Sequence, residues 1–360
     1  MDKRAVIRKT GKVLAVAAGL FLFILALYFV KAGAGGIKAW MVANHIGGIP
    51  GGVGFGWFMA YICLSGSPVA ATSLGLHADH HLNRATGLDS YETFSMIIGS
   101  RLGASMVVLL IGFCYDLRGK KEQRSVYVGA VALLTTLTTY LPALLIGLGI
   151  LGSGALDWVR FNRPDFVGEG LDAVFKPIVE FFRGYLPAWG IFGLGVGVFM
   201  SAFRIFDLAL PAVDPTHGRI ARMSTVVYRP SITFLLGMLV TCVTLSVSVS
   251  ISLLVPLTAR GYVRRENLIP YILGANITTF IDTLFLSLLV NSPDAFTIVF
   301  SALASVSIVT MPIIAFFYGR YERMIDSLAV KATLSRRRLA VFVVILFAMP
   351  GFLLLFGLLR

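Results

Sequence analysis

Long apolar runs separated by short polar loops fill most of this chain. A helix needs about 20 consecutive apolar residues to span a bilayer, and several runs reach or approach that length. The segments predicted to be full-length membrane-spanning helices are 13–32, 91–114, 126–153, 186–212, 268–290, 297–318 and 339–359. The pattern therefore predicts an all-α, polytopic membrane protein.

Two further apolar segments, 51–76 and 231–257, are interrupted by small and polar residues. Each contains a glycine eight positions before a Leu-Ser-X-Ser sequence, which begins at Leu64 in the first segment and at Leu245 in the second. Each is followed by a glycine-led polar stretch that is predicted to start an apolar helix, at Gly99 after the first segment and at Gly274 after the second. A duplicated, interrupted hydrophobic segment is the best sequence indication of a transporter's substrate site.

The composition excludes an ordinary soluble domain. Hydrophobic residues make up 57% of the chain and charged residues only 14%, with a mean hydropathy of +0.84, whereas soluble domains have about 25% charged residues. The net charge of +13 does not predict a nucleic-acid partner, because basic residues of membrane proteins collect in cytoplasmic loops. The three cysteines have the spacing of neither a disulfide framework nor a metal site. We expect no cofactor.

The loop charges indicate how the two interrupted segments meet the membrane. We take the basic N-terminus as cytoplasmic. If both segments crossed fully, the basic loops 115–125, 258–267 and 319–338 would be external, against the positive-inside rule. If each is a re-entrant helical hairpin, these loops are cytoplasmic. The first hairpin then enters from outside and the second from inside, so the two repeats are inverted, as in carriers that work by alternating access.

The predicted organisation is one membrane transporter domain over residues 1–360, in the cell membrane. Repeat 1 covers about 13–153 and repeat 2 about 186–318. The external segment 154–184 between them is amphipathic and rich in aromatic residues, which predicts an interfacial helix. The segment 339–359 is an extra C-terminal span.

The second interrupted segment and the helix after it carry an ordered set of positions. These are Gly237, Thr241, Leu245-Ser246-Val247-Ser248, Pro256, Glu266, Pro270 and Gly274-Ala275-Asn276-Ile277-Thr278-Thr279. In order and spacing they resemble the second repeat of the sodium/phosphate cotransporter family, type II with its bacterial relatives. The first repeat resembles that family more weakly. The resemblance spans roughly 51–114 and 231–290, and it implies a carrier that moves inorganic phosphate together with sodium.

This chain departs from the family pattern at several of the motif positions. The family's glutamine is replaced by Leu64 in the first repeat and by Leu245 in the second. Arg101 stands at an asparagine position, and Thr278 stands at a glycine position. Because leucine cannot form the hydrogen bonds of glutamine, a carrier for an organic or lipid phosphate with altered or absent sodium coupling stays open. A membrane-embedded enzyme is the alternative of another class, although we expect no enzymatic activity.

The predicted site lies between the two hairpin tips. The predicted substrate-binding residues are Ser65, Ser67, Arg101, Ser246, Ser248 and Asn276. The predicted cation-binding residues are Ser250, Thr278, Thr279 and Asp282. Hydroxyl and carboxylate oxygens suit sodium, an acid in an apolar segment is functional by default, and a helix starting at Gly274 would point free amides at an anion. Alternatively, the serines hydrogen-bond to their own helices and allow close packing.

Arg101 has three possible roles in this scheme. Its guanidinium can bind an anionic substrate through two parallel hydrogen bonds. It can instead pair with Asp282, because buried charges usually have partners, or extend to the outer membrane surface. A further hypothesis is that its fixed charge replaces one coupling cation, which predicts reduced sodium dependence.

The remaining motifs give weaker indications. His77, His80 and His81 leave zinc binding or pH sensing open. The glycine run 47–56 lacks the end of a phosphate-binding loop and more often reflects close helix packing. No ATP-binding motif is present in the sequence. The expected partners are a small anionic substrate and membrane lipids, and assembly as a homodimer stays open.

Overall fold

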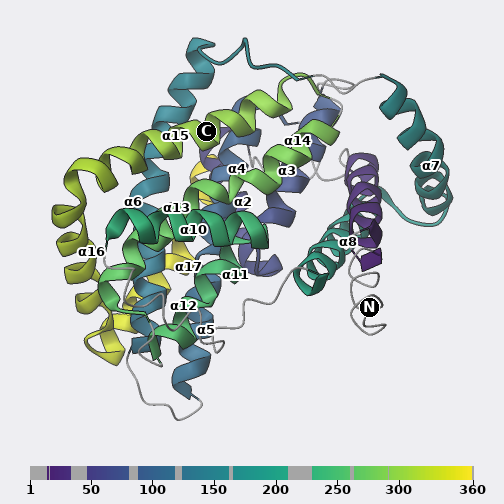
Figure 1. The fold of residues 1–360 in the computed structure, drawn as a ribbon. Helices are drawn as coiled ribbons and strands as arrows, with labels where there is room; N and C mark the ends of the chain where they lie inside the picture. The colour runs from purple at the N-terminus through teal and green to yellow at the C-terminus, as the bar shows by residue number, and fades with distance from the viewer. Residues whose placement is uncertain are drawn as a thin grey trace, which may run out of the picture.

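The computed structural model confirms the all-α class. It describes residues 14–15, 17–33, 47–80, 88–117, 124–161, 165–209, 229–259, 263–290 and 292–358, and within these ranges it contains helices and no strand (Figure 1). The described residues include five helices long and apolar enough to cross a membrane. These are Ser90–Leu110, Val126–Ser153, Arg265–Leu289, Ala295–Thr333 and Arg336–Phe356. They are compatible with a membrane-embedded protein.

Each of the two interrupted segments contains more than one helix. The first consists of α2 (Gly48–Cys63) and α3 (Ser67–His80), and the second of α10 (Pro230–Thr244), α11 (Val247–Ser252) and α12 (Leu254–Ala259). The first break in each segment falls on the leucine of the Leu-Ser-X-Ser sequence. Leu64 has φ 50° and Leu245 has φ 51°, and among the described residues these are the only non-glycine residues with positive φ. The left-handed conformation costs a leucine about 1–2 kcal/mol, so the same unfavourable geometry is held twice.

Glycines bring two pairs of helices into unusually close contact. A Cβ on Gly56 of α2 would lie 2.2 Å from the carbonyl oxygen of Met96, and one on Gly99 would lie 2.2 Å from that of Val53. Both carbonyl partners lie across the contact between α2 and α4 (Ser90–Ala104). Only glycine permits this approach, as expected for the glycine run.

The same contact is repeated between α10 and α13 (Leu268–Thr278). A Cβ on Gly237 would lie 2.1 Å from the carbonyl oxygen of Tyr271, and one on Gly274 would lie 2.0 Å from that of Phe234. Adding 181 to Gly56 and Val53 gives 237 and 234, and adding 175 to Gly99 and Met96 gives 274 and 271. We call residues 48–117 the first unit and residues 230–289 the second unit. The two units share one helix crossing, residue for residue.

The positions predicted as helix starts are wrong. Gly99 lies well inside α4, which begins at Ser90 because Asp89 and Glu92 form a reciprocal capping box. Gly274 likewise lies inside α13, which begins at Leu268. Both glycines serve close packing, so neither one places free helix amides at an anion.

Two predicted spans are locally irregular. The segment 91–114 is divided into α4 and α5 (Met106–Leu117), and 268–290 into α13 and α14 (Phe280–Leu289). Ser105 and Thr279 at these divisions keep right-handed helical angles.

Other helices extend beyond their predicted ends. The span 297–318 continues from α15 (Ala295–Pro312) through a π-helical turn (Ile313–Phe317) into α16 (Tyr318–Thr333). Most of the predicted loop 319–338 is therefore helical.

The rest of the bundle surrounds these two units. The remaining helices are α6 (Arg124–Ser153), α7 (Asp165–Arg183), α8 (Ala188–Ala209), the short 3₁₀ turn Arg265–Asn267 and α17 (Arg336–Leu358). The extra C-terminal span α17 packs against α2, where the Tyr61 hydroxyl donates to the carbonyl oxygen of Leu346 at 3.0 Å.

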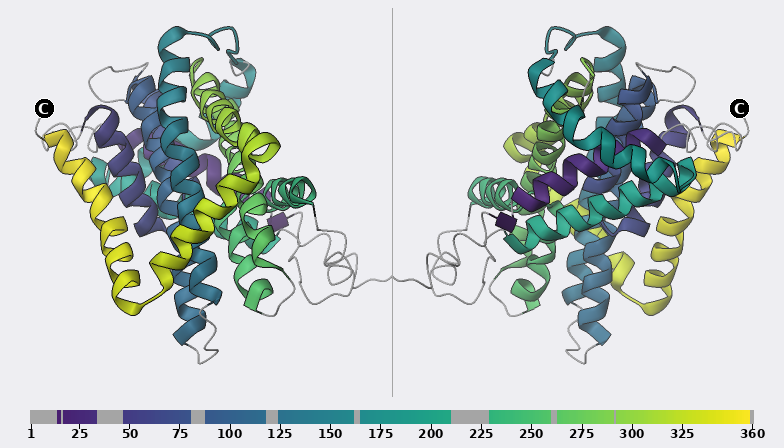
Figure 2. Two further views of the ribbon diagram at one scale, coloured as in Figure 1. Left: turned by 90° about the vertical axis from the view of Figure 1, so that its left-hand side faces the viewer. Right: turned by 90° about the vertical axis from the view of Figure 1, so that its right-hand side faces the viewer.

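The helix Ala17–Gly33, α7 and α8 lie together on one side of the molecule (Figures 1 and 2). An aromatic contact joins α7 to the N-terminal helix, with the rings of Phe175 and Phe21 5.0 Å apart. The predicted amphipathic helix is present as α7, and the structure contains no membrane that would test its interfacial position.

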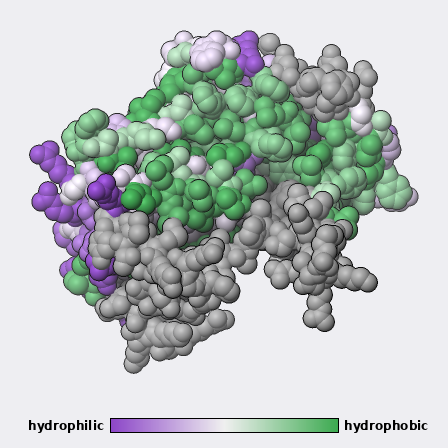
Figure 3. All heavy atoms as spheres, in the orientation of Figure 1, coloured by the Kyte–Doolittle hydropathy of each residue, from purple (hydrophilic) through white to green (hydrophobic). Residues whose placement is uncertain are grey.

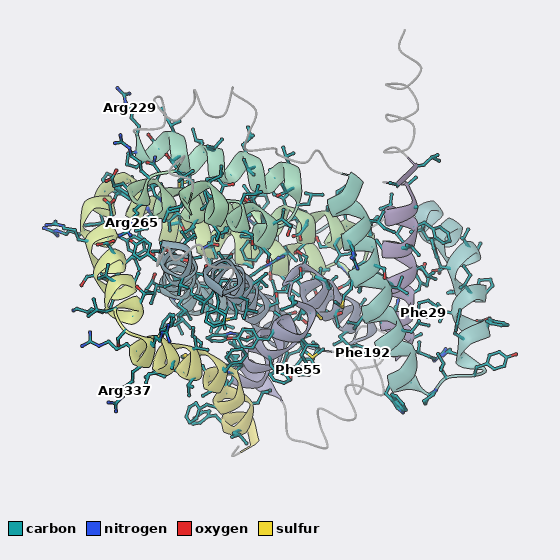
Figure 4. All side chains as sticks on the ribbon, turned by 90° about the horizontal axis from the view of Figure 1, so that it is seen from below. Phe29, Phe55, Phe192, Arg229, Arg265 and Arg337 are labelled. Carbon is teal, nitrogen blue, oxygen red and sulfur yellow. The ribbon has the colours of Figure 1, made fainter. Side chains whose placement is uncertain are left out.

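One face of the molecule is largely apolar where the structure describes it. In Figure 3 hydrophobic residues cover most of the coloured part of the face seen in Figure 1, and hydrophilic residues lie mainly at the edge formed by α16 and at the top. The labelled arginines Arg229, Arg265 and Arg337 lie along one edge in Figure 4, away from Phe29 and Phe192. A continuous exposed apolar surface of this kind suits contact with lipid.

Candidate functional site

Arg101 lies at the centre of the candidate site. It occupies the last turn of α4 and is only 2% exposed, and no other charged residue among those described belongs to the buried class. It does not extend to an outer surface, so that hypothesis is wrong. An ionised side chain at this depth needs partners of opposite charge or good hydrogen bonds.

The guanidinium of Arg101 connects α4 to α3 and to α14. One terminal nitrogen donates to the Ser67 hydroxyl at 3.2 Å, at the start of α3. The other donates to a carboxylate oxygen of Asp282 at 3.1 Å and to the Thr283 hydroxyl, both on α14. Its charged carbon also lies 5.3 Å from the centre of the Phe280 ring, a favourable cation–π arrangement. The pairing hypothesis for Arg101 and Asp282 therefore matches the geometry.

One carboxylate oxygen of Asp282 accepts several hydrogen bonds, whereas the other accepts none. The first oxygen also accepts from the Thr283 backbone amide at 2.6 Å and from the Thr283 hydroxyl at 2.8 Å. The Asp282 side chain is 7% exposed, and its second carboxylate oxygen is buried without a hydrogen-bond partner. The Nε of Arg101 is also buried without one. The cluster thus retains unused hydrogen-bonding capacity on both charged groups.

A small cavity lies against this cluster. Its volume is about 10 Å³, which is room for about one water molecule. Its polar lining residues are Arg101, Ser105, Thr136, Tyr140, Ser248 and Asn276. Three of the predicted substrate-binding residues, Arg101, Ser248 and Asn276, therefore meet at one point from α4, α11 and α13.

Hydrogen bonds hold the cavity walls in place. The side-chain amide of Asn276 donates to the Thr136 hydroxyl at 3.3 Å. The Tyr140 hydroxyl donates to the backbone carbonyl oxygen of Asn276 at 2.8 Å. The Ser248 hydroxyl donates to the carbonyl oxygen of Ala104 at 3.4 Å, across the boundary between the two units. This arrangement gives the cavity donors from both repeats.

The other predicted substrate-binding residues lie at the breaks. Ser67 reaches the cluster through Arg101, as described. Ser246 caps α11 by accepting from the Val249 amide at 3.3 Å. Ser65 is half-buried in the first break.

The predicted cation ligands do not form one coordination shell. The Ser250 hydroxyl is bonded to Thr241 at 2.7 Å and to the Tyr271 hydroxyl at 2.9 Å, within the second unit. Thr278 donates back to the Gly274 carbonyl oxygen at 3.3 Å, the alternative expected for hydroxyl side chains in apolar helices. Thr279 has a buried hydroxyl without a partner, and Asp282 belongs to the Arg101 cluster.

The sequence pattern did not indicate that two residues of α6, Thr136 and Tyr140, line the cavity. A signal existed, because the polar run Thr135-Thr136-Leu137-Thr138-Thr139-Tyr140 lies within an otherwise apolar span. Periodicity alone could not show that this run faces Asn276.

A larger cavity of about 420 Å³ lies elsewhere, between the N-terminal helix, α3, α7 and α14. Its polar lining includes Lys31, Asp172, Lys176 and Arg183, and Lys176 pairs with Asp172 at 3.0 Å. None of the predicted site residues lines it.

No group of three or more potential metal ligands is present in the part of the chain that the structure describes. The His77 ring nitrogen Nδ1 is 3.0 Å from the carbonyl oxygen of Leu88. His81 and the side chain of His80 lie outside the described residues, so zinc binding at this loop stays a prediction.

Comparisons with protein-family models, curated proteins and solved structures give no match. The resemblance to sodium/phosphate cotransporters therefore stays a prediction that rests on the quoted residues.

Proposed function

We propose that this protein is a secondary carrier that moves a small anion, with inorganic phosphate as the first candidate. The observation that carries the proposal is the convergence of Arg101, Ser248 and Asn276 on one buried cavity. These side chains come from both units and supply a guanidinium, whose Nε has no partner, together with neutral polar groups. A guanidinium is the side chain best suited to bind phosphate through paired hydrogen bonds.

The duplicated helix crossing supports an alternating-access mechanism. Carriers of this type have two repeats around a central site formed by discontinuous helices. Here the breaks at Leu64 and Leu245 begin the segments that reach the site. We propose that the two units are inverted re-entrant hairpins, as the loop charges predict, and that they rock against each other.

The small cavity implies that anion binding requires movement. Room for about one water molecule is too little for a tetrahedral anion, since the cavity measures about 10 Å³. The anion would have to separate α11 from α4, which are linked at this point by the long bond from Ser248 to Ala104. We therefore assign the structure to a closed state of the carrier.

The residues support sodium binding less well than they support anion binding. Ser250 and Thr278 use their hydroxyls within their own unit, as described. We therefore include no sodium ion in the proposed mechanism.

Counterflow in proteoliposomes tests the proposal. Vesicles loaded with unlabelled phosphate should take up labelled phosphate, and Arg101→Ala and Asn276→Ala should reduce this uptake at least about tenfold, because each removes a donor to the anion. Arg160→Ala is the matched control, since it removes an exposed arginine paired with Asp157 and Asp294; its uptake should equal that of the wild type.

The outcomes separate the alternatives. Exchange of a phosphate ester without exchange of inorganic phosphate would assign the organic phosphate substrate instead. Absence of uptake for both anions, in vesicles shown to contain folded protein, would reject the carrier function.

A further inference from the structure

Three oxygen atoms converge on the terminal nitrogens of Arg101. They belong to Ser67, Asp282 and Thr283. One carboxylate and two hydroxyl oxygens are the ligands of a small hard cation such as sodium. In this structure the cation that they contact is a side chain.

The charges within the cluster are already balanced. Arg101 contributes one positive charge and Asp282 one negative charge, and both side chains are at least nine-tenths buried. While no anion is bound, a second cation beside Asp282 would leave an uncompensated positive charge away from water, which is strongly unfavourable. Without Arg101, the same carboxylate would need a cation from solution.

Only one repeat unit contains this fixed charge. The position that corresponds to Arg101 in the second unit is Asn276, because 101 plus 175 is 276. Asn276 is neutral and bonds to Thr136 rather than to an acid. The positive charge that balances Asp282 therefore comes from Arg101.

We infer that the guanidinium of Arg101 occupies the position of a coupling cation between Ser67, Asp282 and Thr283, and makes this carrier independent of sodium. This inference rests on the carrier function proposed above. A tethered cation cannot dissociate, so a sodium gradient supplies no energy at this position. The anion then moves by exchange or down its own gradient.

Thermal unfolding of the purified full-length protein in detergent tests the inference without any transport measurement. The melting temperature Tm is compared in sodium chloride and in choline chloride at equal ionic strength. The wild type should show the same Tm in both salts. Arg101→Ala should show a sodium-specific increase in Tm of about 2 °C or more, because an ion that binds only the folded state stabilises it.

Three variants show whether that increase arises at the proposed position. Arg101→Lys keeps a tethered charge and should remain insensitive to sodium. Arg101→Ala combined with Asp282→Asn removes both charges and should lose the sodium response. Arg160→Ala, which removes an arginine that is 56% exposed, controls for the loss of any arginine.

The wild type alone can overturn the inference. A sodium-specific increase in the wild-type Tm that Asp282→Asn abolishes would show that sodium binds beside Asp282 while Arg101 is present. A folded Arg101→Ala variant with no sodium response would also overturn it. If that variant folds in neither salt, the inference is tested by the wild type with Asp282→Asn, where a sodium-specific increase in Tm that depends on Asp282 overturns it. Failure of phosphate counterflow would reject the carrier function and leave these Tm results unchanged.

Discussion

The two units share one helix crossing and differ in polar chemistry. In both, a leucine with left-handed backbone angles ends the first helix. In both, two glycines let two helices approach closely, each glycine against a backbone carbonyl at a corresponding position. The side chains that face the centre differ, with Arg101 in the first unit and Asn276 in the second. The close helix contact leaves no room for a side chain at the glycines. At the centre, one polar side chain can replace another if its hydrogen-bond partners change too. The helix crossing is thus repeated, whereas the charged residue occurs in the first unit only.

The largest expected effect contrasts the two central residues. Arg101→Ala leaves Asp282 as an unpaired buried charge and should lower the free energy of unfolding by about 3–5 kcal/mol. Asn276→Ala removes neutral hydrogen bonds and should lower it by about 1–2 kcal/mol. Denaturant titration in detergent with choline as the only salt cation measures both. Equal losses would contradict the assigned asymmetry.

The glycine contacts should give similar effects in the two units. Gly99→Ala and Gly274→Ala each place a methyl group against a backbone carbonyl and should lower the free energy of unfolding by about 1–3 kcal/mol. Gly193→Ala in α8 is the control, because a Cβ there has nothing within 4 Å. Thermal unfolding measures the three variants side by side. A loss in only one unit would show that the repeated crossing is not equally tight.

A smaller effect should be confined to the second unit. Tyr271→Phe removes the hydroxyl that bonds Ser250 and should lower the free energy of unfolding by about 1 kcal/mol. The corresponding residue of the first unit is Met96, which has no such bond to offer. Met96→Leu, a change of similar volume, should therefore cost less. The same denaturant titration tests this, and the opposite order would argue against a stabilising role for the Thr241–Ser250–Tyr271 network.

The smallest expected effect is a gain in stability at the breaks. Leu64→Gly relieves the left-handed strain, offset partly by the flexibility of glycine, and should raise the free energy of unfolding by about 0.5–1 kcal/mol. Leu245→Gly should gain less, because Leu245 is half-buried whereas Leu64 is 54% exposed. Thermal unfolding measures both variants. A loss at Leu64 would mean that its side chain contributes more contacts than its exposure suggests.

Much of the fold follows from periodicity and spacing. The apolar runs predict the helices because their lengths match a bilayer. The repeated glycine-to-leucine spacing marks both interruptions, and the structure places the first break of each at its leucine, Leu64 and Leu245. The exact ends of helices follow less well, since the capping box at Asp89 and the packing of Gly274 decide them. Hairpin entry and inversion remain predictions from the loop charges.

The candidate site was partly predictable. Arg101 and Asp282 were recognisable as functional candidates because charged residues are rare and costly in apolar segments. Their pairing was one of three possibilities. Residues on α6 were not found, since a hydroxyl or phenol in an apolar helix has several ordinary roles. Ser250 and Thr278 were expected to bind a cation, and the structure shows both hydroxyls bonded within the second unit.

The helical class, the duplicated interruption and the arginine at a position where the other unit has an asparagine can all be recognised in the sequence. These features depend on residue type and spacing along the chain. The packing of the helices is what brings Arg101 to Asp282, 181 residues away, and Ser67 and Thr283 to its terminal nitrogens. A buried charge is satisfied by whichever groups packing brings within about 3 Å, and spacing along the chain does not fix that choice.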